Sequence, residues 1–452
     1  EAFFRGGDFS SAADAYAAAL EELPSGVMAG DLVFQEVLAR IEDGQLTDAA
    51  NRIDTLARDP RLDVVNRWKA EWNLALALQS ANRGAEAYAR VDRIVAEDSV
   101  NPALPADLAV RIAWLQTRLA LEAGEPMRTL ERAPSVRALL GNVGTQLSTQ
   151  VDSSLGLLEA EALFALDRSD EALAQLQKVR DTHGGSDAAV YSYIEEANYH
   201  AGQGQLVKAQ ELLTLLVTNH PNNRYAAFAL YQSALMAEGR REEIYLREAI
   251  GKIEQLVTTY PQSELVFYAR FKQGDLLRKI GEWGLARQTY ESIINAYPQH
   301  ADVLAAQMAL ADTLAAQAGS NDSLRDSAAA IYERLRDLAS APVEMRIEAG
   351  LKAGNALVRR GFGDRAIEMW WQVVDEFLLS EEDSTGLGTK GRYWLARTLA
   401  KLGETLEAQQ QLDGARNAYE LIRDRGLPQG EWAVAQLARL GVVPIETNSG
   451  GS

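Results

Sequence analysis

The chain contains no cysteine and only four histidines, His183, His200, His220 and His300, among its 452 residues. The absence of cysteine excludes a disulfide framework, cysteine-ligated zinc, an iron–sulfur cluster and a thiol nucleophile within this sequence. The scarcity of histidine leaves little material for a histidine-rich metal site. No apolar run approaches the roughly 18 residues of a membrane-spanning helix, so the sequence predicts none.

Positive charge is also scarce. Lysine and arginine number 45 against 64 aspartates and glutamates, which gives a formal net charge of −19. Such a balance argues against non-specific binding to nucleic acid or to anionic membrane surfaces. The excess is uneven, because residues 1–50 and 151–200 each carry 10 acidic side chains against 2 and 3 basic ones, whereas 201–300 carries 10 against 11. We therefore expect different segments to attract differently charged partners.

Catalytic sequence motifs are nearly absent. The sequence has no P-loop, no G-x-S-x-G and no H-E-x-x-H. One G-x-G-x-x-G is formed by Gly386, Gly388 and Gly391, but it follows an acidic loop rather than a strand, which a dinucleotide site needs. This stretch is interpreted as a connector. We expect no enzymatic activity and no cofactor.

One spacing recurs along the chain: a glycine, an apolar residue five positions later, further apolar residues after four and three more, and a proline after another five. Three segments carry it in full: Gly7, Ala12, Tyr16, Ala19, Pro24; Gly204, Ala209, Leu213, Leu216, Pro221; and Gly281, Ala286, Tyr290, Ile293, Pro298. Weaker copies begin at Gly44, Gly361 and Gly403, or are headed by Ala87, Ala172, Ala249 and Ala328.

The order of residue types within each copy indicates a pair of helices. Apolar residues recur at intervals of three and four, which is the helical period. The glycine suits a tight turn between two helices, the alanine lets them approach closely, and the proline ends the second helix. One such pair cannot bury its own apolar stripe, so neighbouring pairs must stack.

This pattern resembles the tetratricopeptide repeat, in which a helix with W-x2-L-G-x2-Y precedes one with A-x3-F and a proline. Residues 7–24 are similar to the second half of such a repeat, and residues 267–298 to nearly a whole one, including Gly274 in the first helix. The resemblance implies an all-α, right-handed superhelical solenoid of antiparallel helix pairs, with about eleven repeats between residue 1 and about residue 425.

Breaks in the pattern suggest how the chain is organised. Segment 138–150 is rich in glycine, serine and threonine and predicts a junction. We expect an N-terminal superhelix at 1–140, a C-terminal one at 151–425 interrupted by a loop at 379–391, a closing helix at 426–443 and a disordered tail at 444–452. Only six residues precede Gly7, so the first repeat is truncated and upstream sequence with a signal or an anchor is expected.

In the resembled family the first helices line a concave groove. Alignment on the repeat glycines selects aromatic, basic and amide side chains for that face: Tyr191, Asn198, Tyr225, Phe228, Gln232, Tyr268, Phe271, Asp275, Arg278, Lys279, Asn355, Arg359, Tyr393, Arg397 and Lys401. Aromatic rings and such donors suit a peptide groove. Its C-terminal part is basic, which favours an acidic or carboxylate-bearing segment. An equally open alternative is that these residues contact neighbouring helices.

The repeat ends TTYPQS at 258–263 and NAYPQH at 295–300 are similar to those of bacterial envelope members of the family. The resemblance implies a non-enzymatic scaffold that binds other proteins, in the periplasm or at the outer membrane, and no nucleic acid. Two alternatives stay open. One is a cytoplasmic regulatory or chaperone-like adaptor, and the other is the accessory superhelix of a cell-wall enzyme whose catalytic part lies upstream.

Overall fold

The computed structural model of this protein describes residues 1–23, 28–57, 59, 62–98, 104–380 and 387–441. Of the described residues, 81% are helical, and none of them lies in a β-strand. Its contacts divide it into two compact units, Glu1–Ala229 and Leu230–Ser452. The division falls within helix α13 (Ala226–Gly239).

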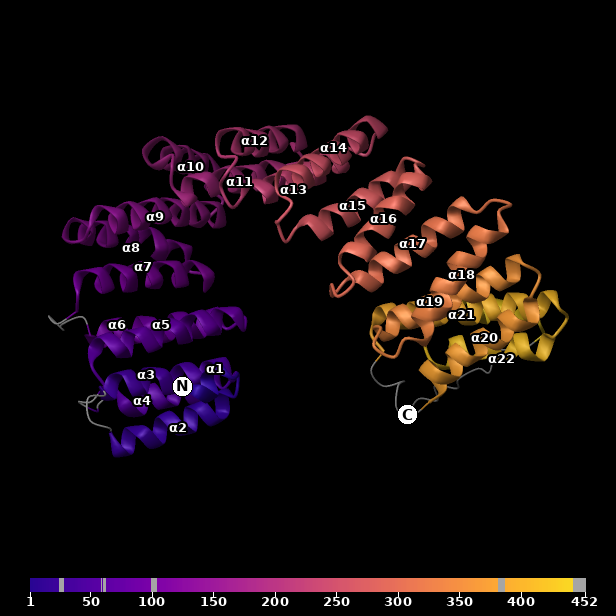
Figure 1. The fold of residues 1–452 in the computed structure, drawn as a ribbon, viewed down its shortest axis with the longest axis horizontal. Coiled ribbons are helices and arrows are strands. Elements are labelled where there is room, and N and C mark those ends of the chain that lie inside the picture. Colours follow the sequence, from indigo (N-terminus) through magenta and orange to yellow (C-terminus); the bar gives the residue numbers. More distant parts are fainter. Residues whose placement is uncertain (24–27, 58, 60–61, 99–103, 381–386, 442–452) are drawn as a thin grey trace, which may run out of the picture. The chain divides into compact units, whose positions relative to one another are not determined.

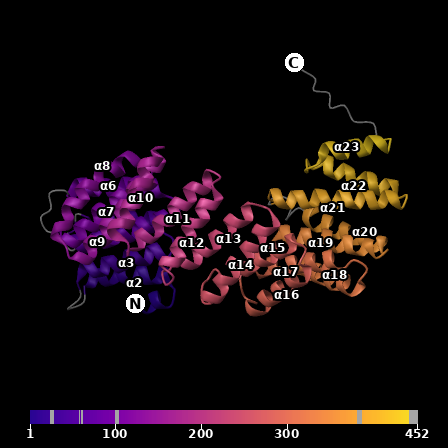
Figure 2. The ribbon, with the colours of Figure 1, turned by 90° about the horizontal axis from the view of Figure 1, so that it is seen from above.

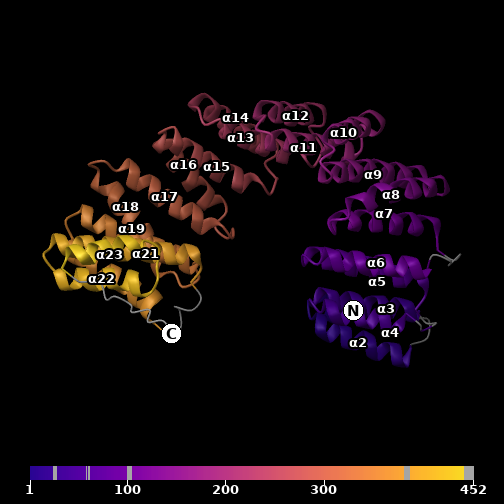
Figure 3. The same cartoon turned by 180° about the vertical axis from the view of Figure 1, so that it is seen from behind.

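Unit 1 consists of consecutive antiparallel helices, each packed against the next (Figure 1). Its helices are α1 (Ala2–Arg5), α2 (Phe9–Glu22), α3 (Ala29–Glu42), α4 (Leu46–Leu56), α5 (Val64–Ser80), α6 (Gly84–Asp98), α7 (Ala106–Glu122), α8 (Pro126–Leu139), the 3-10 helix η1 (Leu140–Asn142), α9 (Thr145–Ala165), α10 (Ser169–His183), α11 (Asp187–Gly202) and α12 (Leu206–Asn219). Figure 3 shows the same succession of hairpins from behind.

Unit 2 continues the alternation after α13, and Figure 2 shows α23 beside α22 at its end. Its further helices are α14 (Glu243–Thr259), α15 (Val266–Lys279), α16 (Trp283–Ala296), α17 (Val303–Gln317), α18 (Asp322–Asp337), α19 (Val343–Arg359), α20 (Gly363–Val374), the π-helical η2 (Asp375–Leu379), α21 (Thr389–Ala408), α22 (Leu412–Asp424) and α23 (Gly430–Arg439). The prediction of an all-α solenoid of helix pairs is confirmed.

The repeated spacing corresponds to the hairpins. A residue with positive φ lies between the two helices of each pair: Gly7, Gly44, Asn82, Gly124, Asp167, Gly204, Arg241, Gly281, Gly319, Gly361 and Gln410. Each second helix buries one alanine that is at most 1% exposed: Ala12, Ala49, Ala87, Ala133, Ala172, Ala209, Ala249, Ala286, Ala328, Ala366 and Ala415. Small side chains at these positions allow the helix axes to approach. Pro221 and Pro298 follow the ends of α12 and α16 as predicted, whereas Pro24 lies outside the described residues.

The expected register of the last repeat is wrong. Gly403 lies inside α21, and the turn is made seven residues later by Gln410, with φ of 62°. The ring of Tyr419 packs onto Gly403, so this glycine makes room for an aromatic side chain. It therefore corresponds to Gly274, which lies seven residues before the turn at Gly281, and not to a turn glycine.

Segment 138–150 is mostly helical. It contains the end of α8, then η1, and the first residues of α9, which begins at Thr145. Leu147, Val151 and Leu155 join Val136 in a buried cluster. This burial outweighs the weak helix propensity of the serines and threonines.

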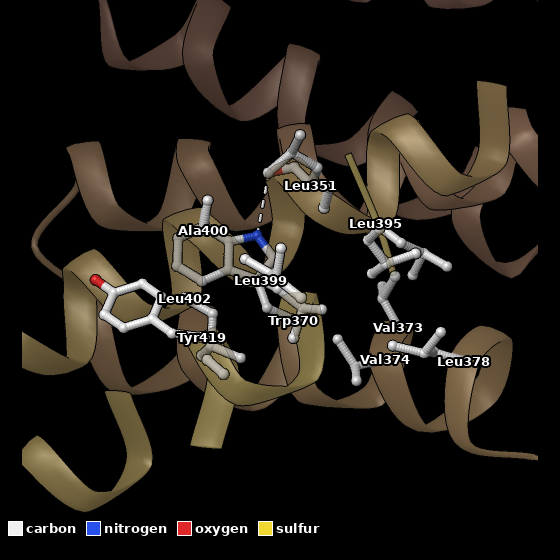
Figure 4. Close-up of a cluster of buried hydrophobic side chains, with 14 of the residues drawn as sticks. Leu351, Trp370, Val373, Val374, Leu378, Leu395, Leu399, Ala400, Leu402 and Tyr419 are labelled. Atoms are coloured by element: carbon white, nitrogen blue, oxygen red, sulfur yellow. Dashed lines mark hydrogen bonds between the residues drawn. The ribbon is translucent and has the colours of Figure 1, made fainter. Parts of the chain in front are cut away.

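The core of unit 2 lies between successive hairpins. Figure 4 shows Trp370 of α20 enclosed by side chains of α19 and α21, with its indole Nε1 donating to the carbonyl of Leu351 at 3.2 Å. Closing helix α23 buries Ala433 and Leu437 against the same cluster. This helix occupies Gly430–Arg439 of the span 426–443 in which a closing helix was expected, and the expected tail at 444–452 lies outside the described residues.

Candidate functional site

The α19–α21 groove is a hollow of about 660 Å³ in unit 2. Residues four apart lie on one face of a helix, so each helix turns one stripe of side chains toward the hollow. The lining residues are Leu351, Asn355, Val358 and Arg359 of α19, Arg397, Ala400, Lys401 and Glu404 of α21, and Gln429 and Trp432 at the start of α23. Four residues selected by the sequence alignment thus line this one hollow: Asn355, Arg359, Arg397 and Lys401. The last two were selected through Gly403, whose expected register is wrong.

Three cationic side chains line this groove. Arg359 and Arg397 are exposed, and Lys401 is half-buried. Lys401 Nζ donates to Glu404 Oε2 at 2.9 Å, which balances its charge. In the described part of the chain Arg359 belongs to no ion pair, and Arg397 only approaches the hydroxyl of Tyr393, at 3.5 Å. Two guanidinium groups therefore face the groove without a partner carboxylate.

The remaining lining residues complement these charges. Leu351, Val358 and Trp432 supply apolar contact area, and Asn355 supplies both an amide donor and a carbonyl acceptor. A guanidinium group binds a carboxylate through two parallel hydrogen bonds. The arrangement suits a ligand with an anionic group and a short apolar or peptide portion beside it.

The α17–α19 hollow, of about 320 Å³, shares Asn355 and Arg359 with the groove. Here Lys352 Nζ donates to both carboxylate oxygens of Asp312 at 2.8 and 2.9 Å, and the hydroxyl of Tyr332 donates to Asp312 at 2.7 Å. Burial, followed by the charge of Asp312, raises the pKa of Tyr332. Among the charged residues that line this hollow, only Arg359 belongs to no ion pair in the described part of the chain.

On α15 the predicted residues bind one another. The Tyr290 hydroxyl donates to Asp275 Oδ1 at 2.6 Å, and Arg278 Nη1 lies 3.9 Å from the same oxygen. Burial, then the hydrogen bond to Asp275, raises the pKa of Tyr290. Arg278 lowers the pKa of Tyr332, so its guanidinium lies near the α17–α19 hollow. Lys279 instead binds Glu238 at 2.5 Å.

The other predicted residues do not join this groove. Tyr268 is 42% exposed and its hydroxyl donates to Asp302 at 2.9 Å, while Phe271 packs against Phe267. Asn198 is exposed, and Phe228 and Gln232 are half-buried. Tyr191 and Tyr225 line a separate hollow in unit 1, with ring centroids 5.1 Å apart.

Sequence reasoning missed six lining residues: the apolar Leu351, Val358 and Ala400, and also Glu404, Gln429 and Trp432. Gln429 and Trp432 belong to the end of the chain that follows the last repeat, where the glycine alignment selects nothing. Glu404 lies six residues before the turn at Gln410, the offset that Asp275 has before Gly281. An alignment on Gln410 instead of Gly403 would have selected it.

Two further features of the described residues are relevant to function. No described helix is long and apolar enough to cross a membrane. Within the described ranges no three histidine, aspartate or glutamate side chains come together as a metal site would require.

Comparison with known proteins finds one segment of this chain that is similar to a tetratricopeptide repeat. The sequence model of the tetratricopeptide repeat family matches residues 268–300, which cover α15 and α16. A search of curated proteins finds no match. Among solved structures, the C-terminal part of a TPR repeat-containing protein from Cytophaga hutchinsonii is 14% identical, with a TM-score of 0.42, over 59% of this chain and 95% of that one.

Two other solved structures have similar scores. A tetratricopeptide repeat protein from Parabacteroides merdae is 13% identical over 64% of this chain and 98% of its own, with a TM-score of 0.35. Yeast Tom70 is 14% identical over 97% of this chain and 87% of its own, also with a TM-score of 0.35.

Proposed function

We propose that this tetratricopeptide repeat protein is a non-enzymatic scaffold that binds an acidic or carboxylate-bearing segment of a partner protein in the α19–α21 groove. The observation that carries the proposal is the pair of guanidinium groups, Arg359 and Arg397, which face one hollow without a partner carboxylate in the described part of the chain. In a chain of net charge −19, a local cationic groove favours an anionic ligand over the surrounding surface.

The shape of the groove supports a protein segment as the ligand. Trp432 and Leu351 line it beside the arginines, and large apolar contacts next to charged donors are typical of protein-binding surfaces. Asn355, another lining residue, offers hydrogen bonds to a peptide backbone. Binding through such a groove needs no catalytic group, which agrees with the absence of catalytic motifs from the sequence.

The test is a titration of a fluorescein-labelled peptide of alternating glutamate and glycine, followed by fluorescence anisotropy. We expect the double variant Arg359→Gln/Arg397→Gln to bind about tenfold more weakly than wild type, because two charge-assisted hydrogen-bonding groups are lost. The matched control is Lys279→Gln/Arg365→Gln, which removes the same charge outside the groove. We expect it to bind within about twofold of wild type, since distant charges are screened.

Equal weakening in both double variants would show that the peptide responds to net charge alone, and the proposal would be wrong. A second comparison uses the same peptide with an amidated C-terminus. Unchanged affinity would assign recognition to the acidic side chains, and a marked loss would assign it to the terminal carboxylate.

We also propose that the protein works in the bacterial cell envelope. Support comes from the tyrosine–proline repeat ends at 258–263 and 295–300, which are similar to those of envelope members of the family. Fractionation of cells that express the full-length protein tests this location. Recovery of the protein only with cytosolic markers would contradict it and favour a cytoplasmic adaptor.

A further inference from the structure

The α7–α9–α11 hollow is a second cavity, of about 900 Å³, in unit 1. Its walls come from α7, α9 and α11, which are the first helices of three successive hairpins, and from residues just before α13. Hydroxyl and amide side chains of α9, including Gln150 and Ser154, line it. A cavity of this size accommodates several residues of an extended chain or a drug-sized molecule.

Among the charged residues that line this hollow, one carboxylate has no ion-pair partner in the described part of the chain. Arg118 Nε lies 2.8 Å from Glu122 Oε1, and Arg224 Nη2 lies 3.0 Å from Asp187 Oδ2, so both arginines are paired. Glu161 also lines the hollow, and it belongs to no ion pair in the described part of the chain. The lining therefore has one carboxylate, that of Glu161, which forms no ion pair with a lysine or arginine of the described residues.

Aromatic rings lie beside this carboxylate. Tyr191 and Tyr225 line the hollow with ring centroids 5.1 Å apart. Trp114 also lines it, and its indole Nε1 donates to Ser154 Oγ at 2.9 Å, which fixes the ring. Aromatic faces attract cations. The guanidinium groups of Arg118 and Arg224 already lie 5.7 and 4.8 Å from the ring centroids of Trp114 and Tyr225, so the ring of Tyr191 and the carboxylate of Glu161 are the groups left for a positively charged side chain of a ligand.

We propose that the α7–α9–α11 hollow binds a basic segment of a partner protein, with a lysine or arginine side chain of that segment against Glu161. The segment has the opposite charge to the ligand proposed for the α19–α21 groove. Hydroxyl and amide groups along α9 hydrogen-bond the peptide backbone. The two hollows thus give one chain two protein-binding sites of different specificity.

The electrostatic surroundings of Glu161 make such binding depend on pH. Burial, then the charge of Glu195 on α11, raises the pKa of Glu161 to about 7, with Glu122 of α7 acting in the same direction and Arg118 opposing it. The neighbouring Tyr191 has its pKa raised to about 12 and stays neutral. A bound cation favours the ionised carboxylate, so affinity increases as the pH rises through about 7.

The test uses a fluorescein-labelled peptide of alternating lysine and glycine, titrated with the whole chain at pH 8 and followed by anisotropy. We expect Glu161→Gln to bind about tenfold more weakly, because a charge-assisted hydrogen bond is lost. The matched control is Glu131→Gln, an exposed position of α8 outside the hollow, with affinity within about twofold of wild type. Lowering the pH to 6 weakens binding to wild type more than binding to Glu161→Gln.

Three outcomes would overturn this proposal. The first is no binding of the lysine peptide to wild type at millimolar concentration, and the second is equal affinity of Glu161→Gln and wild type. The third is that spermidine binds as tightly as the peptide and with the same dependence on Glu161. The hollow would then be assigned to a small polyamine. Binding of the glutamate peptide to the α19–α21 groove does not change in Glu161→Gln, so the two proposals fail independently.

Discussion

Trp370 of α20 packs its indole ring directly onto the backbone of Gly354 in α19. A β-carbon on Gly354 would lie only 2.1 Å from the indole Nε1 and 2.3 Å from Cε2. The same indole nitrogen donates to the carbonyl of Leu351, so the ring has little freedom to move away. Gly274 under Tyr290 and Gly403 under Tyr419 repeat this relationship in two other hairpins.

Gly354→Ala is therefore expected to destabilise unit 2 by about 1–3 kcal/mol, because the added methyl group overpacks a buried contact. The measurement is urea denaturation followed by circular dichroism. Gly251→Ala is the matched control, since Gly251 lies within α14 with no atom near its would-be β-carbon. It should gain about 0.5–1 kcal/mol through helix propensity. A Gly354→Ala variant as stable as wild type would show that α19 and α20 adjust without cost.

Replacement of the turn residue Gln410 by glycine is expected to stabilise the protein, whereas Gly354→Ala destabilises it. Gln410 holds φ of 62°, whereas the equivalent Gly281 holds 79°. A side chain in this left-handed region costs about 1–2 kcal/mol, which glycine avoids. We expect Gln410→Gly to raise the free energy of unfolding by about 1 kcal/mol and Gly281→Ala to lower it by a similar amount. Thermal denaturation of both variants checks this, and shifts of the same sign would contradict it.

The comparison of sequence with structure explains why one register was misjudged. Glycine occurs at two positions of these hairpins, in the turn, as at Gly281, and seven residues earlier beneath an aromatic ring, as at Gly274. The two uses look the same in the sequence. In the last hairpin the turn is made by Gln410. A glutamine does not mark a turn in the sequence, so the glycine spacing points to Gly403 instead. Burial of the second-helix alanines was predictable because it follows from helical period alone.

The part of the candidate site that lies on a single helix was predictable from the sequence. Arg397 and Lys401 lie four residues apart and so face the same hollow. Whether a charge is free depends on partners distant in sequence, which no local pattern reveals. Lys279 is bound by Glu238, 41 residues earlier, whereas Arg359 has no such partner among the residues that the structure describes. No local sequence feature distinguishes the paired Lys279 from Arg359.

A buried ion pair in unit 1 yields a prediction about pH. Glu71 of α5 is 1% exposed, and Arg90 Nε of α6 lies 2.6 Å from its Oε2. Arg90→Met leaves a buried carboxylate without its partner, which is expected to cost about 3–5 kcal/mol at neutral pH. The double variant Arg90→Met/Glu71→Leu should recover most of this loss.

The sign of the pH dependence follows from burial. Burial raises the pKa of Glu71, an effect that Arg90 partly offsets, so removing Arg90 raises it further. A folded state with a raised carboxyl pKa binds protons more readily than the unfolded chain, and its stability increases as the pH falls. The deficit of Arg90→Met relative to wild type should therefore shrink between about pH 7 and pH 5. A deficit independent of pH would mean that Glu71 reaches solvent in the variant.

Two adjacent residues of α16 test the packing between hairpins. Ala286 is 0% exposed, whereas Leu285 is 51% exposed. Ala286→Arg forces a long charged side chain between helices and should open protease sites near residues 280–300. Leu285→Arg adds the same side chain on the solvent face and should leave the cleavage pattern unchanged. Limited proteolysis with chymotrypsin, which does not cleave after the introduced arginines, measures both variants at equal times, and identical patterns for the two would contradict the packing.

Each helix packs mainly against its neighbours in the chain. This has a consequence for how the length of such a protein changes in evolution. Gly7 and Gly44 are 37 residues apart, and Gly361 and Gln410 are 49 apart, so successive hairpins already differ in length without loss of the buried alanine in each. Duplication or deletion of one hairpin replaces a local junction and leaves the others intact. Chain length can thus vary in whole hairpins, while the α7–α9–α11 hollow, which is lined by three first helices, is inherited as a block.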